Sequence, residues 1–268
     1  MSFIDVLGFR NLLETRHAYD IRDVLLQLRE FTAPVEELPI RRVKEPRLLS
    51  RAFADSVSDA VVRVRVFDTQ YNDGAFFHEL LDLLHAQVEC IGHGVVIRAG
   101  VAVGKAHVGL DGKGPVFGPA MVRAYEIETD EAVHPRILVD EAAYQSFLDD
   151  ARLRQQDHDL EEELRHVDRL LRVDADGKRF IDYLGASESE FDDPAGYFVF
   201  LERHAELVRG KLAATSGRVR EKFEWLAGYH NSIVDEIIAQ FGRRSAEAVM
   251  AEYDLDPMSF LRGLVVSS

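Results

Sequence analysis

The chain contains a single cysteine, Cys90, among its 268 residues. One cysteine excludes an intrachain disulfide and a cysteine-rich zinc site, and it fits a reducing compartment. No apolar run reaches the roughly 18 residues of a membrane-spanning helix. The N-terminus also lacks a basic segment followed by an apolar core, which is the signature of a signal peptide. We therefore expect a cytoplasmic protein with no direct membrane contact.

Positive charge is scarce as well. The chain has 47 acidic residues against 32 lysines and arginines, which gives a formal net charge of -15. This balance argues against nonspecific binding to nucleic acid or to an anionic membrane. A polyanionic ligand would need a metal ion or a local cationic pocket. The acidic run DLEEEL, at 159–164, is expected to be a solvated helix face.

The hydrophobic patterns predict an α+β fold. The predicted strands lie at 3–7, 95–109, 134–140 and 179–185, and two further strands form a predicted hairpin within 48–67. The predicted helices lie at 17–31, 76–91, 120–131 and 141–153. The order β-α-β-β-α-β matches a ferredoxin-like or palm-type core, expected as an antiparallel sheet with helices on one face. We assign 1–190 to this core and 191–268 to a C-terminal helical extension that packs on the core or on a dimer partner.

An acid stands inside the first apolar run, FIDVLGFRNLL at 3–13. A buried carboxylate costs several kcal/mol unless a cation compensates it. Asp5 ends the first predicted strand, and Asp55 lies at the predicted hairpin tip, so the two can converge at one end of the sheet. Two such carboxylates favour Mg²⁺ or Mn²⁺. The alternative is structural: Asp5 caps the turn before Gly8, and Asp55 starts the hairpin turn.

Four segments resemble the motifs of class III nucleotidyl cyclases, in family order and with similar spacing, over residues 3 to about 145. FIDVLGF resembles their first metal motif, and AFADSVSDAV resembles their hairpin motif, with Ala54 in place of a glycine. IRAGVAVGKAHVG resembles their R-x-G strand, and VFGPAMVRAY resembles the segment that follows. The matched positions are Arg98, Gly100, Gly104, Phe117, Gly118 and Ala124. The combination of F-A-D-S, G-P-A, A-Y-E-I-E and P-R-I-L-V resembles the pyrimidine cyclases of bacterial anti-phage (Pycsar) systems.

The resemblance implies a metal and phosphate site at the end of the first strand. Asp5 and Asp55, with the carbonyl of Val6, would bind two Mn²⁺ or Mg²⁺ ions, and the ribose 3′-hydroxyl would attack the α-phosphorus. The β- and γ-phosphates would lie against backbone amides at the turn into the first helix. These amides belong to Leu7, Gly8 and Phe9.

The residue that reads the base would be Arg51, four residues before Asp55. Arginine only donates hydrogen bonds, so it suits an acceptor edge such as uracil O4, and less well cytosine, whose N4 is a donor. The second base-reading position corresponds to Pro115, which has no polar side-chain group. The alternative is that Arg51 faces solvent on the hairpin.

The asparagine and arginine that stabilise the transition state in the family fall on Val122 and Glu126, whose side chains cannot replace them in this function. Arg123 is one residue out of register and can substitute for them, as can Arg98 or Lys105. This departure leaves open a catalytically dead protein.

The resemblance as a whole implies a cyclase that converts UTP to 3′,5′-cyclic UMP, with residues 1–190 as its catalytic domain. Two subunits would form the site, as a homodimer, and a separate effector protein would read the second messenger during phage infection. The alternatives are a cytidylate cyclase that acts on CTP, or a degenerate cyclase fold that serves as a nucleotide-binding or dimerisation module.

Overall fold

The computed structural model describes residues 1–17, 19–22, 25, 52–57, 60–109, 115–240 and 257–267. They form two compact units. The first consists of Met1–Cys90 and Val95–Asp182, and the second of Ile91–Gly94 and Tyr183–Ser268. The C-terminal unit thus begins at Tyr183, whereas the sequence suggested a boundary after residue 190. Of the helix predicted at 17–31, the described residues 19–22 and 25 are helical.

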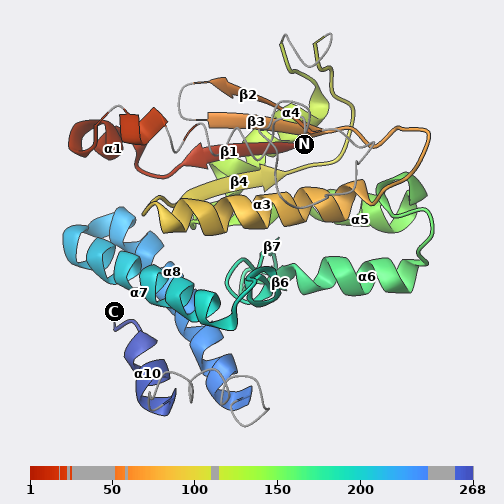
Figure 1. Ribbon diagram of the computed structural model, residues 1–268. Helices are drawn as coiled ribbons and strands as arrows, with labels where there is room; N and C mark the ends of the chain where they lie inside the picture. The colour runs from red at the N-terminus through yellow and green to blue at the C-terminus, as the bar shows by residue number, and fades with distance from the viewer. Residues whose placement is uncertain are drawn as a thin grey trace. The chain divides into compact units, whose positions relative to one another are not determined.

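The first unit contains one mixed sheet and the helices that cover it (Figure 1). Its strands are β1 (Ser2–Val6), β2 (Ala52–Val57), β3 (Ala60–Arg65), β4 (Ile97–Val101), β5 (Ile137–Val139), β6 (Leu171–Val173) and β7 (Arg179–Ile181). Its helices are α1 (Phe9–Thr15), α3 (Ala75–Gly92), α4 (Pro119–Glu126), α5 (Glu141–Asp149) and α6 (Leu160–Arg169), with a short π-helix, η3 (Ile127–Glu131), and a short 3₁₀ helix, η4 (Ala151–Leu153). The predicted hairpin and the helix at 76–91 are confirmed, and the strands predicted at 95–109, 134–140 and 179–185 are confirmed over the shorter ranges of β4, β5 and β7. The sequence reading did not identify α1 or β6.

The sheet has the strand order β2-β3-β1-β4-β5-β7-β6. Within its first four strands, β1 is antiparallel to β3 and to β4, and β2 is antiparallel to β3. This arrangement gives the two split βαβ units expected of a ferredoxin-like order. The β4–β5 pair, however, is parallel. The expectation of an antiparallel sheet is therefore wrong at this pair, because the chain crosses over through α4 and η3 before it returns as β5.

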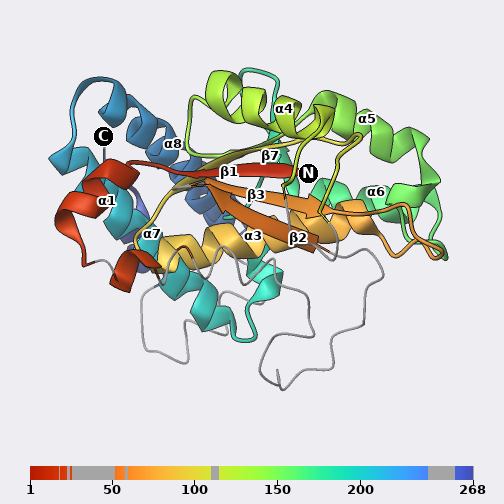
Figure 2. The same cartoon turned by 90° about the horizontal axis from the view of Figure 1, so that it is seen from above.

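Helices cover both faces of the sheet, as Figure 2 shows for α3 and α4. The hydroxyl of Ser2 donates to Glu79 of α3 at 2.8 Å, whereas the ring of Phe3 meets Tyr125 of α4 edge-on, with 5.2 Å between ring centroids. Successive strand residues point to opposite faces, so α3 and α4 lie on opposite sides. The expectation of helices on one face is wrong, because the parallel β4–β5 crossover carries α4 over the second face.

The face under α3 contains a buried ion pair among its apolar side chains. Arg63 is 1% exposed, and its Nε donates to Glu79 at 2.9 Å, while Asp82 also contacts its guanidinium. Burial opposes the charge on Glu79, but Arg63 and Arg65 outweigh this effect and lower the pKa of the carboxyl to about 2. The pair therefore stays charged inside the unit.

The face under α4 is packed unusually closely. A Cβ on Gly100 of β4 would lie 2.3 Å from the carbonyl oxygen of Ala124 and 2.6 Å from Cβ of Ile127. A Cβ on Gly118, which has a φ of 142°, would lie 2.7 Å from the carbonyl oxygen of Lys105. Gly100 therefore lets α4 approach the sheet, and Gly118 lets the start of α4 approach the segment that follows β4.

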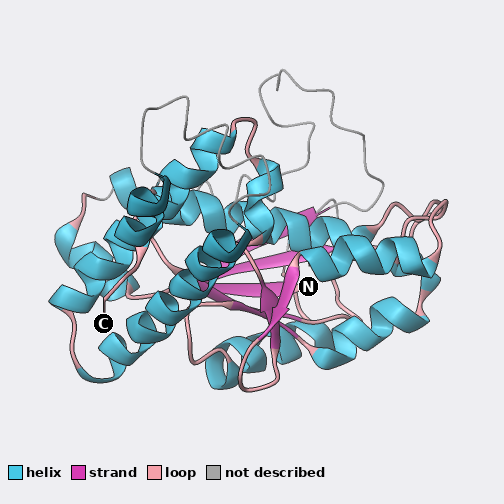
Figure 3. Ribbon diagram, turned by 90° about the horizontal axis from the view of Figure 1, so that it is seen from below, coloured by secondary structure: helices cyan, strands magenta, loops and turns pink. Residues whose placement is uncertain are grey.

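The second unit is formed by helices in its described part, which Figure 3 draws in cyan. They are η5 (Ala186–Glu190), α7 (Pro194–Ala214), α8 (Gly217–Gln240) and α10 (Pro257–Leu264). The helical character predicted from residue 191 onward is confirmed for α7, α8 and α10.

Two buried histidines connect the helices of this unit. Nδ1 of His204 on α7 lies 3.1 Å from Nδ1 of His230 on α8, and Nε2 of His230 lies 3.1 Å from the Leu264 carbonyl of α10. A carbonyl only accepts, so neutral His230 carries its proton on Nε2, and His204 must donate from Nδ1. Nε2 of His204 then accepts from the hydroxyl of Tyr183 at 2.7 Å. Burial lowers the pKa of both imidazoles, that of His230 to about 4.

Candidate active site

Asp5 lies near the end of β1, on the face covered by α4 and η3. Its partner across the antiparallel β1–β4 pair is Arg98, and Arg98 Nε lies 3.2 Å from Asp5 Oδ2. Both side chains are about one-fifth exposed. The acid in the apolar strand is thus compensated by a cation from the neighbouring strand, and it remains accessible to solvent.

Glu128 of η3 is a second acid at this place, and the sequence reading gave it no role. Its side chain is 4% exposed, and its Oε1 lies 2.6 Å from Arg98 Nε. One guanidinium therefore faces two carboxylates, Asp5 and Glu128, on one face of the sheet. The only sequence signal was the A-Y-E-I-E segment, whose second acid is Glu128. The two carboxylates and the guanidinium thus form one charged cluster at the end of β1.

Asp55 lies inside β2, and its backbone pairs with Val62. The expectation that it sits at the hairpin tip is wrong, because β2 continues through Val57, which still pairs with Ala60. Asp5 pairs with Ala60 on the other side of β3. Residues 60 and 62 share a face, so the register assigns position 55 to the same face as Asp5. Two strand spacings of about 4.8 Å separate β1 from β2.

The turn after β1 contains a glycine in a left-handed conformation, and its contact with phosphate stays a prediction. Gly8 has a φ of 75°, a conformation that favours glycine, and α1 starts at Phe9 without a side-chain cap. The amide of Leu7, however, donates to the Val96 carbonyl at 2.9 Å. The Leu7 amide is therefore used in the sheet, which leaves the amides of Gly8 and Phe9 as the candidates for phosphate contact. The side chain of Val6 is buried, and the ligand expected from this residue is its backbone carbonyl.

Arg123, the other arginine considered for stabilising the transition state, has acidic partners of its own. It binds Asp140 through Nε at 3.1 Å and Nη2 at 2.9 Å, and its Nη1 donates to Glu131 at 2.7 Å. The hydrogen bonds that Arg123 donates to Asp140 and Glu131 raise its pKa. The structure therefore brings Arg98, and not Arg123, into contact with Asp5.

The other positions considered for catalysis or base reading are exposed or lie outside the described residues. Val122 and Glu126 are exposed on α4, at the positions where the resemblance expects an asparagine and an arginine. Pro115 and Lys105 are also exposed. Arg51 lies outside the described residues, so its role in base reading stays a prediction.

A second group of potential metal ligands lies at the start of α6, apart from Asp5. It consists of His158, Glu162 and His166, whose ligand atoms all lie within 4.8 Å of one another. The predictions from sequence assign no role to these residues, although Glu162 and His166 are four apart and so share a helix face.

Comparison of the chain with protein-family models, with curated proteins and with solved structures found no match. Among the helices that the structure describes, none combines the length and apolar character needed to cross a bilayer.

Proposed function

We propose that this chain is a metal-dependent pyrimidine nucleotide cyclase that converts UTP to 3′,5′-cyclic UMP and diphosphate. The observation that carries the proposal is the register, which assigns positions 5 and 55 to one face of the sheet, within the four strands that form two split βαβ units. That arrangement of two acids, together with the motif resemblance, favours phosphoryl-transfer chemistry over a purely structural role for Asp5.

The types of ligand atom at this site fit hard divalent cations. Asp5, Asp55 and the carbonyl of Val6 offer oxygen ligands only, which suits Mn²⁺ or Mg²⁺, with two ions per site. Glu128 adds negative charge beside Asp5. When bound, such ions would neutralise the triphosphate and lower the pKa of the ribose 3′-hydroxyl.

Arg98 and the turn at Gly8 also have roles in the proposal. Arg98 neutralises negative charge next to Asp5, so it can stabilise the charge that develops on the α-phosphate during diphosphate departure. Gly8 has no side chain, so the backbone of the turn can approach the β- and γ-phosphates. Arg51 would select uracil. CTP is the alternative substrate, to be distinguished by direct competition with UTP.

A second candidate is a nucleotide-binding or dimerisation module without turnover. Two observations favour it: Val122 and Glu126 offer no transition-state donor, and Arg98 already neutralises Asp5. The signature of such a module is nucleotide binding without product. In the enzymatic proposal, a homodimer completes the site, and the cyclic nucleotide acts as a second messenger in anti-phage defence for a separate effector protein.

The test is a panel of the four ribonucleoside triphosphates, each with Mn²⁺ or Mg²⁺, with products identified by mass spectrometry. The proposal expects cyclic UMP and diphosphate in equal amounts, with UTP preferred over CTP. Binding of UTP without product would support the module instead, and product from a purine nucleotide alone would overturn the pyrimidine assignment.

A further inference from the structure

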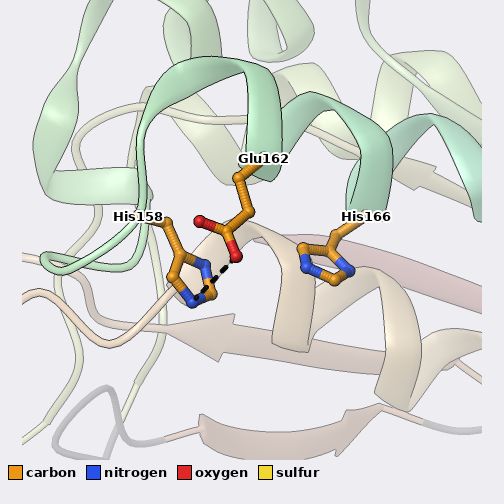
Figure 4. A group of neighbouring side chains, drawn as sticks. All are labelled: His158, Glu162 and His166. Atoms are coloured by element: carbon orange, nitrogen blue, oxygen red, sulfur yellow. Dashed lines mark ion pairs between the residues drawn. The ribbon is translucent and has the colours of Figure 1, made fainter.

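We propose that His158, Glu162 and His166 form a binding site for a divalent transition-metal ion of the Zn²⁺ type. This site is separate from the Asp5 face and does not rest on the cyclase proposal. In Figure 4 the carboxylate of Glu162 lies between the two imidazole rings. His158 precedes α6, whereas Glu162 and His166 lie on it, so the ion would connect the helix to the segment before it.

The distances are close to those of a coordinated ion. His158 Nε2 lies 3.9 Å from Glu162 Oε1, and the rings of His158 and His166 stack with 5.8 Å between centroids. Tetrahedral Zn²⁺, with bonds of about 2.0–2.2 Å, holds its ligand atoms roughly 3.4 Å apart. Small side-chain rotations are therefore enough to close the site around an ion.

Glu163 orients the first ligand. Its side chain is 3% exposed, and its Oε1 lies 2.7 Å from Nδ1 of His158. An ionised carboxylate only accepts, so Nδ1 of His158 donates, and the lone pair of a neutral His158 is on Nε2, the atom that faces Glu162. A carboxylate behind a ligating histidine is a frequent arrangement in metal sites, where it fixes the tautomer and makes the imidazole more basic.

Charge around the group favours a cation. Oε2 of Glu163 is buried and has no hydrogen-bond partner in the part of the chain that the structure describes. The negative charge of Glu163 is therefore only partly compensated, and Glu162 adds a second negative charge. A divalent ion bound to Nε2 of His158 compensates both.

The ligand types select the class of ion. Two imidazoles and one carboxylate suit Zn²⁺ and its transition-metal neighbours, whereas Mg²⁺ and Ca²⁺ prefer oxygen ligands. The side chains of His158 and Glu162 are 35% and 41% exposed, and His166 is also exposed. Solvent can therefore reach the site, and three protein ligands leave a fourth position for water.

The experiment measures Zn²⁺ binding to the full chain by titration calorimetry at neutral pH, with excess Mg²⁺ present to fill oxygen-only sites. We expect one Zn²⁺ per chain at this site. Loss of a ligand in His166→Gln or Glu162→Gln should weaken binding by roughly 10-fold or more. The matched controls are His17→Gln, an exposed histidine elsewhere, and Glu161→Gln, an 86% exposed neighbour with the same change in charge.

Co²⁺ provides a second measurement that does not depend on the variants. Bound to the unaltered chain, it should give the intense visible absorption of a tetrahedral site, and Zn²⁺ should abolish this absorption. Absence of Zn²⁺ binding to the unaltered chain would overturn the proposal. Equal binding by the ligand variants and the unaltered chain would overturn it too. An equal loss in Glu161→Gln would point to local charge instead of coordination and would also contradict it.

Discussion

Arg98 of β4 stands directly opposite Asp5 of β1, and it also lies 2.6 Å from buried Glu128. One arginine therefore serves two acids on the face that carries the proposed site. Arg123, which the sequence offered as an equal candidate, is committed to Asp140 and Glu131 instead. The two arginines can be told apart by experiment.

Arg98→Lys is expected to lower kcat for UTP by roughly 100-fold, because a lysine keeps the charge but loses the planar fork that can bind phosphate. Since Glu128 retains a cation, Tm should change little. Arg123→Lys is the matched variant, and we expect a lower Tm with kcat nearly unchanged. Steady-state kinetics and thermal unfolding measure both. The reverse pattern would assign the catalytic role to Arg123.

Because of Glu79, the stability of the first unit should fall at acid pH. Its folded pKa of about 2 lies below the ordinary 4.5, so its contribution is present above about pH 4.5 and is lost as the pH falls toward 2. Such a shift corresponds to roughly 3 kcal/mol. Glu79→Gln should therefore destabilise the unit by about 3 kcal/mol at pH 7, because Arg63 loses a partner. Urea unfolding followed by circular dichroism measures this.

The pH profile provides the control for Glu79. Below pH 4.5, the stability of the variant should fall less steeply than that of the unaltered chain. Glu161→Gln, at an exposed position, should leave both the free energy of unfolding and its pH profile unchanged. Identical slopes for the Glu79 variant and the unaltered chain would refute the assignment.

The second unit should respond to acid at a higher pH. Burial lowers the pKa of His230 from 6.5 to about 4, so the unfolded state binds more protons in this window, and stability falls as the pH drops from 6.5 to 4. The only tryptophan, Trp225, lies in this unit and stacks on Tyr229, so its fluorescence reports on the unit. His230→Gln, which can still donate to Leu264, should make this dependence shallower, while His204, whose pKa burial also lowers, retains part of it. An unchanged acid profile in that variant would contradict the account.

Gly100→Ala should destabilise the first unit by about 1–3 kcal/mol, because the added methyl group would overlap the backbone of α4. The matched control is Gly104→Ala, whose Cβ would meet Ala120 at an ordinary 3.4 Å. Urea unfolding should show a large effect for the first variant and a small one for the second. Equal effects would mean that the close approach of α4 to β4 is not what requires the glycine.

Local patterns predicted much of the first unit. The alternation around β2 and β3, the continuous apolar run at β4 and the periodicity of α3 each follow from short stretches of sequence. The crossover that puts α4 on the second face did not, because it depends on the parallel pairing of β4 with β5, which lie 36 or more residues apart. The arrangement of Arg98 between two acids depends on the same packing.

The residues around α6 show a second limit of prediction from local sequence patterns. The run DLEEEL was expected to be a solvated face, and this is correct for Glu161, which is 86% exposed. It is wrong for Glu163, which is 3% exposed because it turns back to His158. The spacing of Glu162 and His166 was a readable signal, but the third ligand precedes the helix, where periodicity gives no guidance.

Asp5 is the residue on which the proposed cyclase site most depends. The most direct measurement is the amount of cyclic UMP formed from UTP and Mn²⁺ by the unaltered chain and by Asp5→Asn, with Asp20→Asn, at an exposed position, as the control. Asp5→Asn should stay folded, because Arg98 keeps Glu128 as its partner. We expect cyclic UMP and diphosphate from the unaltered chain and the control, and none from Asp5→Asn. Product from all three, or from none of them, would contradict the proposal.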